Sequence, residues 1–244
     1  MNNPRIRRLG ANIDHVATVR QARRAPYPDP VYAAAICENA GAAQITCHIR
    51  GDRRHIIDSD IPRLRDMVQT QLNVEMAATD EMLKLVCPIL AHHPNRHRIT
   101  LVPERPDEVT TEGGLNVKAL RDDIVQVISS IRSQNIKVSL FVDPDPAQIQ
   151  ASVIEGVDMI ELNTAAYAEG EPNALARLVQ GAQLAEELGF EVAAGHGLTI
   201  HNLPMLVSAA PNIIEYNIGH SLIARAIFVG LEQATKDLIQ LIRQ

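Results

Sequence analysis

Carboxylates that can transfer protons stand inside short apolar segments of this sequence. Glu75 lies in the segment Asn-Val-Glu-Met-Ala, and Glu161 lies in Met-Ile-Glu-Leu-Asn. A carboxylate among buried apolar residues costs free energy unless it is paired or used in chemistry. We therefore interpret Glu75 and Glu161 as catalytic candidates, although a lone Glu in a strand is more often part of an edge or a solvated face.

Histidines follow other apolar segments at equivalent positions: His48, His196 and His220. Histidine gives and accepts protons near neutral pH, so such a set suits a reaction with several proton transfers. Any single one of them is equally well interpreted as a hydrogen-bonded structural residue. The combination is what favours catalysis.

Zinc binding is the alternative role for these histidines. The sequence has no HExxH or comparable motif, so we predict no metal site. A separate histidine group, interrupted by a proline, is expected to lie in a solvated loop: His92, His93 and His97.

Two glycine-containing segments are typical of phosphate binding, Gly195-His-Gly-Leu-Thr199 and Asn217-Ile-Gly-His-Ser221. Glycines let backbone N–H groups approach an anion, and the second segment runs directly into a predicted helix, whose N-terminus attracts negative charge. A second candidate anion site is a basic cluster, for which a solvated charged loop is the alternative: Arg23, Arg50, Arg53, Arg54 and His55.

The elements that must position these residues alternate along the chain. Strand-like apolar segments are predicted at residues 9–13, 43–49, 72–77, 99–102, 138–142, 159–162, 191–194 and 213–218. Helical segments are predicted at 30–39, 60–69, 79–90, 116–133, 146–155, 173–188, 203–209 and 221–242. Alternating strands and helices indicate a parallel sheet, and eight such pairs in 244 residues favour a closed barrel.

We therefore predict an α/β fold, a (β/α)8 TIM barrel, with residues 1–244 forming one catalytic domain. The carboxyl ends of barrel strands share one face, where active sites lie. A doubly wound open sheet is the alternative. It favours a glycine-rich turn after the first strand, whereas the first strand here ends in Asn12-Ile-Asp-His15.

Composition excludes several classes of protein. The formal net charge of −6 argues against nucleic-acid binding, but it allows a small anionic substrate, because a local field in a cleft can oppose the net charge. No segment approaches the roughly 18 apolar residues of a membrane span, and residues 1–8 lack the apolar core of a secretory signal. Cys37, Cys47 and Cys87 form no CxxC pair, which predicts reduced thiols in a cytoplasmic protein.

The segment 103–114 is long for a strand-to-helix connection and is predicted to be a lid. Gly113 and Gly114 would form its hinge, and Thr110 and Thr111 would donate hydroxyl groups to a ligand.

Taken together, these motifs resemble the pyridoxine 5′-phosphate synthase family, from about Leu9 to the C-terminal helix. The motifs that carry the resemblance are Asn12-Ile-Asp-His15, His48-Ile-Arg50-x-Asp-Arg-Arg-His55, Asn73-Val-Glu75-Met-Ala, Leu101-Val-Pro-Glu104, Thr110-Thr-Glu-Gly-Gly114, Ala194-Gly-His196-Gly-Leu and Asn217-Ile-Gly219-His220. A departure is Asn163, which stands where some relatives have histidine.

The resemblance implies an enzyme that condenses 1-deoxy-D-xylulose 5-phosphate with 3-amino-2-oxopropyl phosphate. The products are pyridoxine 5′-phosphate, phosphate and water, in de novo vitamin B6 biosynthesis. It further implies a barrel with extra helices, no organic cofactor, small phosphorylated substrates and a homo-octamer.

The resemblance also implies a role for each matching residue. Glu75 and His48 correspond to proton acceptors, His196 to the proton donor, and Glu161 to the residue that stabilises cationic or dehydrating transition states. The implied contacts to the amino-ketone phosphate are Asn12, Arg23, Gly197, Gly219 and His220. The implied contacts to deoxyxylulose phosphate are Asp14, His15, Arg50, His55 and Thr110.

Two other functions fit the same fold. A different phosphosugar enzyme, such as an isomerase or aldolase, is compatible with a barrel. None of the eight predicted strand ends carries the lysine that a Schiff-base aldolase needs. A non-catalytic phosphate-binding protein would use the glycine segments, but it would not need Glu75, Glu161 and the histidines together.

Overall fold

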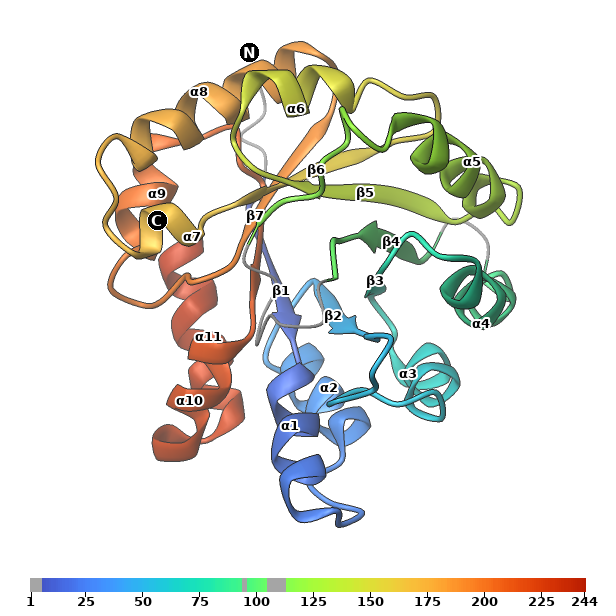
Figure 1. Ribbon diagram of the computed structural model, residues 1–244. Coiled ribbons are helices and arrows are strands. Elements are labelled where there is room, and N and C mark those ends of the chain that lie inside the picture. Colours follow the sequence, from blue (N-terminus) through green and yellow to red (C-terminus); the bar gives the residue numbers. More distant parts are fainter. Residues whose placement is uncertain (1–5, 94–95, 105–112) are drawn as a thin grey trace.

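Eight parallel strands close into a barrel in sequence order, with β1 pairing to both β2 and β8. The structure is a computed structural model that describes residues 6–93, 96–104 and 113–244. Helices surround the strands on the outside, as Figure 1 shows. The predicted (β/α)8 TIM barrel is therefore confirmed, and the doubly wound sheet was wrong.

Each predicted strand is present, and its ends lie within two residues of the expected ones. The strands are β1 Arg8–Asn12, β2 Gln44–His48, β3 Gln71–Met76, β4 Arg98–Leu101, β5 Lys137–Val142, β6 Met159–Asn163, β7 Glu191–Gly195 and β8 Glu215–Ile218. All have nearly continuous burial, because helices cover their outer faces and side chains fill the barrel interior.

The helices include the extra ones that the resemblance implied. They are α1 Asp14–Arg23, α2 Pro30–Asn39, α3 Asp60–Met67, α4 Asp80–Leu90, α5 Arg121–Arg132, α6 Pro146–Ala151, α7 Ala165–Ala168, α8 Ala174–Glu187, α9 Leu203–Ala209, α10 His220–Val229 and α11 Leu231–Ile242. Local signals explain several starts. Asp29 accepts a hydrogen bond from the Val31 N–H at the start of α2, and Thr79 accepts one from Met82 at the start of α4.

Three helix predictions were wrong in their extent. The helix predicted over 146–155 ends at Ala151. The segment predicted as one helix over 221–242 is two helices, because Gly230 adopts φ 83° and ψ 150° and breaks the chain direction between α10 and α11. The helix predicted from residue 116 begins only at Arg121. Neither α1 nor α7 was predicted.

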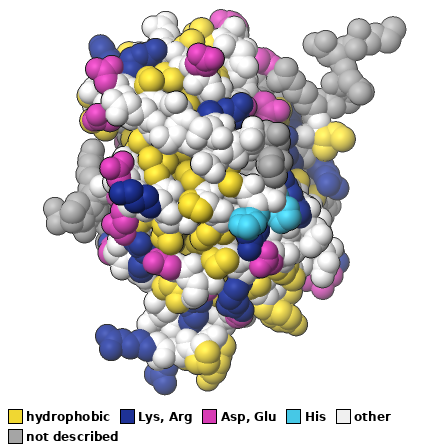
Figure 2. Space-filling model, turned by 90° about the vertical axis from the view of Figure 1, so that its right-hand side faces the viewer, with side chains coloured by type: hydrophobic (Ala, Val, Ile, Leu, Met, Phe, Trp, Pro, Cys, Tyr) yellow, Lys and Arg dark blue, Asp and Glu magenta, His cyan; other side chains and the backbone are white. Residues whose placement is uncertain are grey.

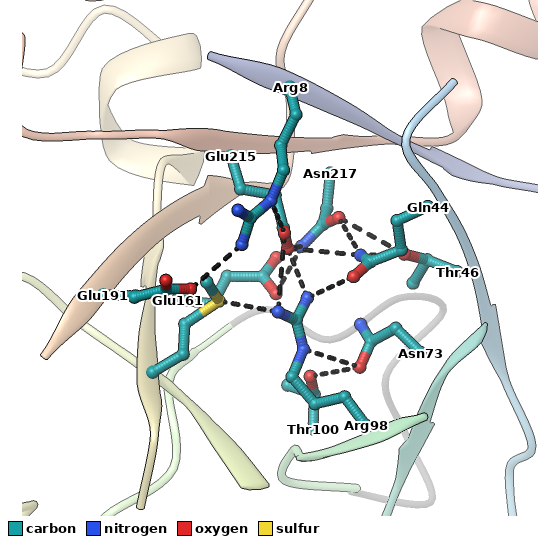
Figure 3. A network of polar contacts seen from close by, with 11 residues as sticks. Arg8, Gln44, Thr46, Asn73, Arg98, Thr100, Glu161, Glu191, Glu215 and Asn217 are labelled. Atoms are coloured by element: carbon teal, nitrogen blue, oxygen red, sulfur yellow. Dashed lines mark hydrogen bonds and ion pairs between the residues drawn. The ribbon is translucent and has the colours of Figure 1, made fainter. Parts of the chain in front are cut away.

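The interior of the barrel is unusually polar. TIM barrels are usually filled by branched apolar residues. Here the aliphatic side chains of the strands pack outward against the helices, and the interior holds a hydrogen-bonded set of polar side chains: Gln44, Thr46, Asn73, Arg98, Thr100, Glu215 and Asn217 (Figure 3). This polar set lies in the barrel directly below the carboxyl ends of the strands, beneath the candidate site.

The predicted solvated histidine loop was wrong for His97. This side chain is fully buried, and its Nδ1 accepts a hydrogen bond from the Leu72 N–H at 3.4 Å. Burial lowers the pKa of His97 to about 4. His97 is buried because it lies directly before β4, where the chain enters the barrel.

Three further observations concern the described residues only. Cys37, Cys47 and Cys87 are buried and free. Within the described ranges, no helix has the length and apolar character needed to cross a membrane. The same part of the chain holds no group of three or more acidic, histidine or cysteine side chains arranged to bind a metal ion.

Candidate active site

The end of β1 forms a compact turn that ties three predicted site residues together. Asn12 Oδ1 accepts from the Asp14 N–H at 2.9 Å, and Asn12 Nδ2 donates to Asp14 Oδ2 at 2.9 Å. Asp14 Oδ1 then accepts from the backbone N–H of His48 at 2.8 Å. The Asn-Ile-Asp sequence therefore links the carboxyl ends of β1 and β2.

His48 lies between two carboxylates at the end of β2. Its Nδ1 is 4.0 Å from Glu75 Oε2, and its Nε2 is 3.0 Å from Glu104 Oε1. The second oxygen of Glu104 accepts from the Gly51 N–H at 2.9 Å. Burial would raise the pKa of Glu104, but the hydrogen bonds from His48 and Gly51 hold it below its usual value.

Glu104 is a site residue that the sequence analysis did not assign. It appeared only within the Leu101-Val-Pro-Glu104 motif at the end of the fourth strand. Its position there is a signal, because the carboxyl ends of all barrel strands converge. The sequence predicted only a lid after the fourth strand, which left this carboxylate without a role.

Glu75 projects from β3 toward the mouth, with a side-chain exposure of 15%. Burial raises its pKa well above the usual value, and the charges of Glu161 and Asp14 raise it further, against the opposing effect of Arg98. Burial and the neighbouring carboxylates thus favour the protonated form of Glu75, and an approaching positive charge would favour the ionised form.

Glu161, on β6, is 3% exposed and accepts a hydrogen bond from Asn217 Nδ2 at 2.8 Å (Figure 3). Burial and the charge of Glu215 raise its pKa to about 7, whereas Arg98 and the Asn217 hydrogen bond oppose the rise. A carboxyl group with this pKa exchanges its proton readily near neutral pH, which suits acid–base chemistry.

The space beside Glu161 requires a glycine on β7. A Cβ atom at Gly195 would lie 2.2 Å from Glu161 Oε1. After β7 the chain turns through two residues with positive φ, His196 at 83° and Gly197 at 73°. The Thr164 hydroxyl donates to the carbonyl oxygens of Gly195, at 2.8 Å, and His196, and so holds this turn beside the end of β6.

The residues of the predicted phosphate site lie where β8 meets β1. A Cβ atom at Gly219 would lie 2.9 Å from Asn12 Oδ1, so the glycine segment packs directly on the β1 turn. The rings of His15 and His220 have centroids 5.2 Å apart, and α10 begins at His220. Asn12, His15, Gly219 and His220 thus surround one helix N-terminus, which is a favourable place for an anion.

The basic cluster is only partly available to a ligand. Arg50 is buried, with its Nε 3.7 Å from Asp52 Oδ1, and the His55 ring centroid lies 5.9 Å from that of His48. The other two arginines of this loop form ion pairs within the protein: Arg53 with Asp58 and Glu81, and Arg54 with Asp52. All three arginines of this loop thus have carboxylate partners, and His55 is the member of the cluster whose ring lies beside His48.

Two predicted contacts are not brought to the mouth by the described residues of this chain. Arg23 is exposed in the last turn of α1, roughly 14 Å along the helix axis from Asp14. Thr110, like Thr111, lies outside the described residues.

A pocket of about 800 Å³ adjoins the mouth on the side of β5 and β6. Its lining includes Gly113, Asp143, Asn163, Arg177 and His196. Asp143 Oδ1 accepts from the Gly114 N–H at 3.0 Å and from Asn163 Nδ2 at 2.9 Å. Asp143, which directly follows β5, therefore fastens the described end of the segment 103–114 to the barrel.

Comparison with known proteins places this site in a family. The family described as pyridoxal phosphate biosynthesis protein PdxJ matches residues 9–244. The pyridoxine 5′-phosphate synthase of Trichlorobacter lovleyi is 50% identical over 242 residues, covering 97% of this chain and 99% of the relative. The protein of the same name from Aliivibrio fischeri is 48% identical over 235 residues, covering 94% of each chain.

Solved structures of low sequence identity share only the fold. A protein from Aquifex aeolicus has a TM-score of 0.69 at 12% identity, covering 99% of this chain and 95% of the other. A tryptophan synthase chain from Mycobacterium tuberculosis has a TM-score of 0.67 at 13% identity, covering 99% of this chain and 94% of the other.

Proposed function

The chain belongs to the pyridoxal phosphate biosynthesis protein PdxJ family, and we propose that it condenses 1-deoxy-D-xylulose 5-phosphate with 3-amino-2-oxopropyl phosphate. It is an enzyme of the pyridoxine 5′-phosphate synthase type with a role in vitamin B6 biosynthesis. The observation that carries the proposed substrates is the arrangement of the mouth, where the acid–base groups lie between two candidate anion sites.

The proton-transfer groups suit a ring-closing condensation. Imine formation, phosphate elimination, loss of water and ring closure each move protons, so one site needs groups whose pKa values differ. Glu161 has a pKa of about 7, whereas that of Glu75 lies well above its usual value. Approach of a cationic nitrogen would favour the ionised form of Glu75 and allow it to accept a proton.

We carry the acid–base roles over from the family resemblance, and the geometry of the mouth is compatible with them. Glu75 and His48 act as proton acceptors, since His48 Nδ1 faces Glu75 across 4.0 Å. His196 lies in the turn that the Thr164 hydroxyl holds at the end of β7, and it acts as the proton donor. Glu161, buried beneath the mouth, stabilises cationic or dehydrating transition states.

Each phosphate has its own candidate site. The amino-ketone phosphate binds at the N-terminus of α10, with contacts from Asn12, Gly197, Gly219 and His220. The deoxyxylulose phosphate binds beside β2, with contacts from Asp14, Arg50, His55 and His15. His15 also borders the first site, since its ring centroid lies 5.2 Å from that of His220. Contacts from Arg23 and Thr110 remain part of this proposal on the strength of sequence resemblance. Compact sites of this kind fit small phosphorylated molecules rather than nucleic acid.

The reaction is tested by incubating the purified protein with both substrates and following the absorbance of the pyridine product. Omission of either substrate should abolish the signal, and phosphate release should match product formation. A folded protein that makes no pyridine product from the two substrates would remove this proposal.

We further propose that residues 1–244 form one catalytic domain that assembles into a homo-octamer in the cytoplasm. Large apolar side chains are exposed near the contacts of α1 with α2 and α10: Tyr27, Tyr32, Ile227 and Phe228. Figure 2 shows apolar and basic side chains together where the molecule projects at the bottom. Exposed apolar patches of this kind often mark interfaces. Light scattering of the purified protein measures the assembly directly.

The proposed compartment is supported by the cysteines. Cys37, Cys47 and Cys87 are buried free thiols, and such thiols are usual where the surroundings are reducing. Fractionation of cells that express the tagged protein tests this location.

A further inference from the structure

A buried ion pair lies in the barrel interior below Glu161, and the proposed chemistry leaves it without a role (Figure 3). The side chains of Arg98 and Glu215 are 3% and 0% exposed. Burying such a pair costs about as much free energy as the attraction returns, and apolar side chains of similar volume often stabilise a core better. Stability alone therefore does not explain why this barrel is polar where others are aliphatic.

Arg98 is held from several directions, so its positive charge has a fixed position. Its Nη2 donates to Gln44 Oε1 at 2.7 Å and to Glu215 Oε1. Its Nε donates to Asn73 Oδ1 at 3.2 Å, and its Nη1 lies 3.0 Å from Met159 Sδ. Arginine stays protonated at any pH at which the protein folds.

Asn217 connects this ion pair to Glu161. Its Nδ2 donates to Glu161 Oε2 at 2.8 Å and to Glu215 Oε1 at 3.4 Å. Its Oδ1 accepts from Gln44 Nε2 at 3.0 Å and from Thr46 Oγ1 at 3.2 Å. These two donors determine the orientation of the amide, because a flipped amide would present N–H groups to donors and an oxygen to carboxylates.

We infer that Arg98 and Glu215 are a positioning pair for the proposed reaction. Through the Asn217 amide they hold the Glu161 carboxyl group in place, and their charges set the pH at which it exchanges its proton. The inference rests on the catalytic role proposed for Glu161. It adds that the polar interior of the barrel, which does not contact the proposed substrates, controls the Glu161 carboxyl group above it.

The charges around Glu161 explain the direction of this control. The charged or titratable groups that face it, or lie at the ends of the strands beside it, are Glu75 on β3, Arg98 on β4, Asp143 after β5, His196 after β7 and Glu215 on β8, with Arg8 on β1 behind Glu215. Burial would raise the pKa of Glu215, but Arg98 and Arg8 lower it to about 2. Glu215 is therefore a constant negative charge that disfavours ionisation of Glu161.

The test follows the protonation of Glu161 itself by infrared titration of the carboxylic acid C=O band. The band of Glu161 is assigned as the one lost in Glu161→Gln. Glu215→Gln removes the negative charge and leaves Arg98 in place, so the midpoint of this band should move to lower pH by about one unit. Arg8→Gln removes a positive charge that partly neutralises Glu215, so the midpoint of the Glu161 band should move to higher pH.

The matched control is Thr235→Val, which removes a buried hydroxyl on α11, outside the barrel interior. The Thr235 hydroxyl donates to the Leu231 carbonyl oxygen at 2.8 Å and is not part of the polar set around Arg98. The midpoint of the Glu161 band in this variant should equal that of the unmodified protein. An unchanged midpoint in folded Glu215→Gln overturns the inference. Should Glu215→Gln fail to fold, Arg8→Gln decides, since Arg8 is partly exposed and its loss leaves the core intact.

A second measurement separates this inference from the proposed function. The pH profile of kcat in Glu215→Gln should move with the infrared midpoint, whereas a merely structural effect would lower kcat equally at every pH. A shifted band with an unshifted kcat profile would uphold the control of Glu161 and remove Glu161 from the catalytic step.

Discussion

The Nε2 of His48 lies 3.0 Å from Oε1 of Glu104, so a carboxylate that follows β4 orients a histidine at the end of β2. An ionised carboxylate only accepts hydrogen bonds, and the pKa of Glu104 lies below its usual value. Nε2 is therefore a protonated nitrogen, and in the neutral imidazole the lone pair of Nδ1 faces Glu75 across 4.0 Å. In the proposed reaction, Glu104 would thus orient His48 as a base that faces Glu75.

Glu104→Gln should lower kcat by about 10- to 100-fold, because the amide keeps the shape but loses the charge that selects the His48 tautomer. Steady-state kinetics with both substrates measure the change. Glu81→Gln is the control, since Glu81 is an exposed carboxylate that pairs with Arg53 of the neighbouring loop. Equal kcat values for the two variants would show that Glu104 does not orient the base.

Glu75→Gln should lower turnover by at least roughly a hundredfold, because an amide cannot accept the proton that a general base takes up. Substrate affinity, measured by equilibrium binding of one substrate, should change far less. Near-normal turnover by the folded variant would exclude Glu75 as a base.

Glu161→Gln should make the protein more stable at pH 8 than the unmodified chain, with little difference at pH 5. The pKa of Glu161 in the folded protein is raised to about 7 from the usual 4.5. The folded state thus holds this proton more tightly than the unfolded state, and stability is lost as pH rises from about 4.5 to about 7. The loss amounts to roughly 3 kcal/mol, and glutamine avoids it. Urea denaturation at the two pH values measures the difference. A constant difference would contradict the raised pKa.

Gly195→Ala should reduce kcat because its Cβ would lie 2.2 Å from Glu161 Oε1 and force that carboxylate to move. If displacement of Glu161 is the whole cause, the double variant Gly195→Ala/Glu161→Gln should be no slower than Glu161→Gln alone. Additive losses in this double-mutant cycle would place the effect of Gly195 elsewhere.

Asp143→Ala should raise KM for the substrates more than it lowers kcat. The carboxylate accepts hydrogen bonds from the Gly114 N–H and from Asn163 Nδ2, and both are lost in the variant. Loss of these two hydrogen bonds would weaken substrate binding if the segment 103–114 closes over the substrates. Asp145→Ala is the control, because Asp145 caps α6 from the same loop and does not bond to Gly114. A KM equal to that of the control would argue against a lid.

The barrel and its mouth were predictable from the sequence because their signals are local. Apolar segments with strand length alternate with amphipathic helical ones, and that period alone indicated a closed parallel barrel. Glu75 and Glu161 stood out because a carboxylate in a covered strand is unusual. The break at Gly230 was not visible in the helical pattern, since one residue with positive φ interrupts a periodicity that otherwise continues.

The buried ion pair in the barrel interior was not predictable in the same way. Arg98 was placed outside the fourth strand, and Glu215 lay unnoticed within the eighth, 117 positions away in the chain. Arg98 looked like an ordinary charged residue beside a strand, and Glu215, although a carboxylate inside a predicted strand, was not singled out. Only closure of the barrel, which brings β4 and β8 to face each other across one interior, turns them into a buried pair.

By itself, then, the sequence determined the order of the elements, the strand ends that meet at the mouth and the residue types available there. The tertiary structure decided which of them meet: Glu104 with His48, Asp143 with Gly114, and Arg98 with Glu215 beneath Glu161. The physical reason is that periodicity and capping are set by neighbours along the chain, whereas these contacts depend on the stagger and closure of eight paired strands.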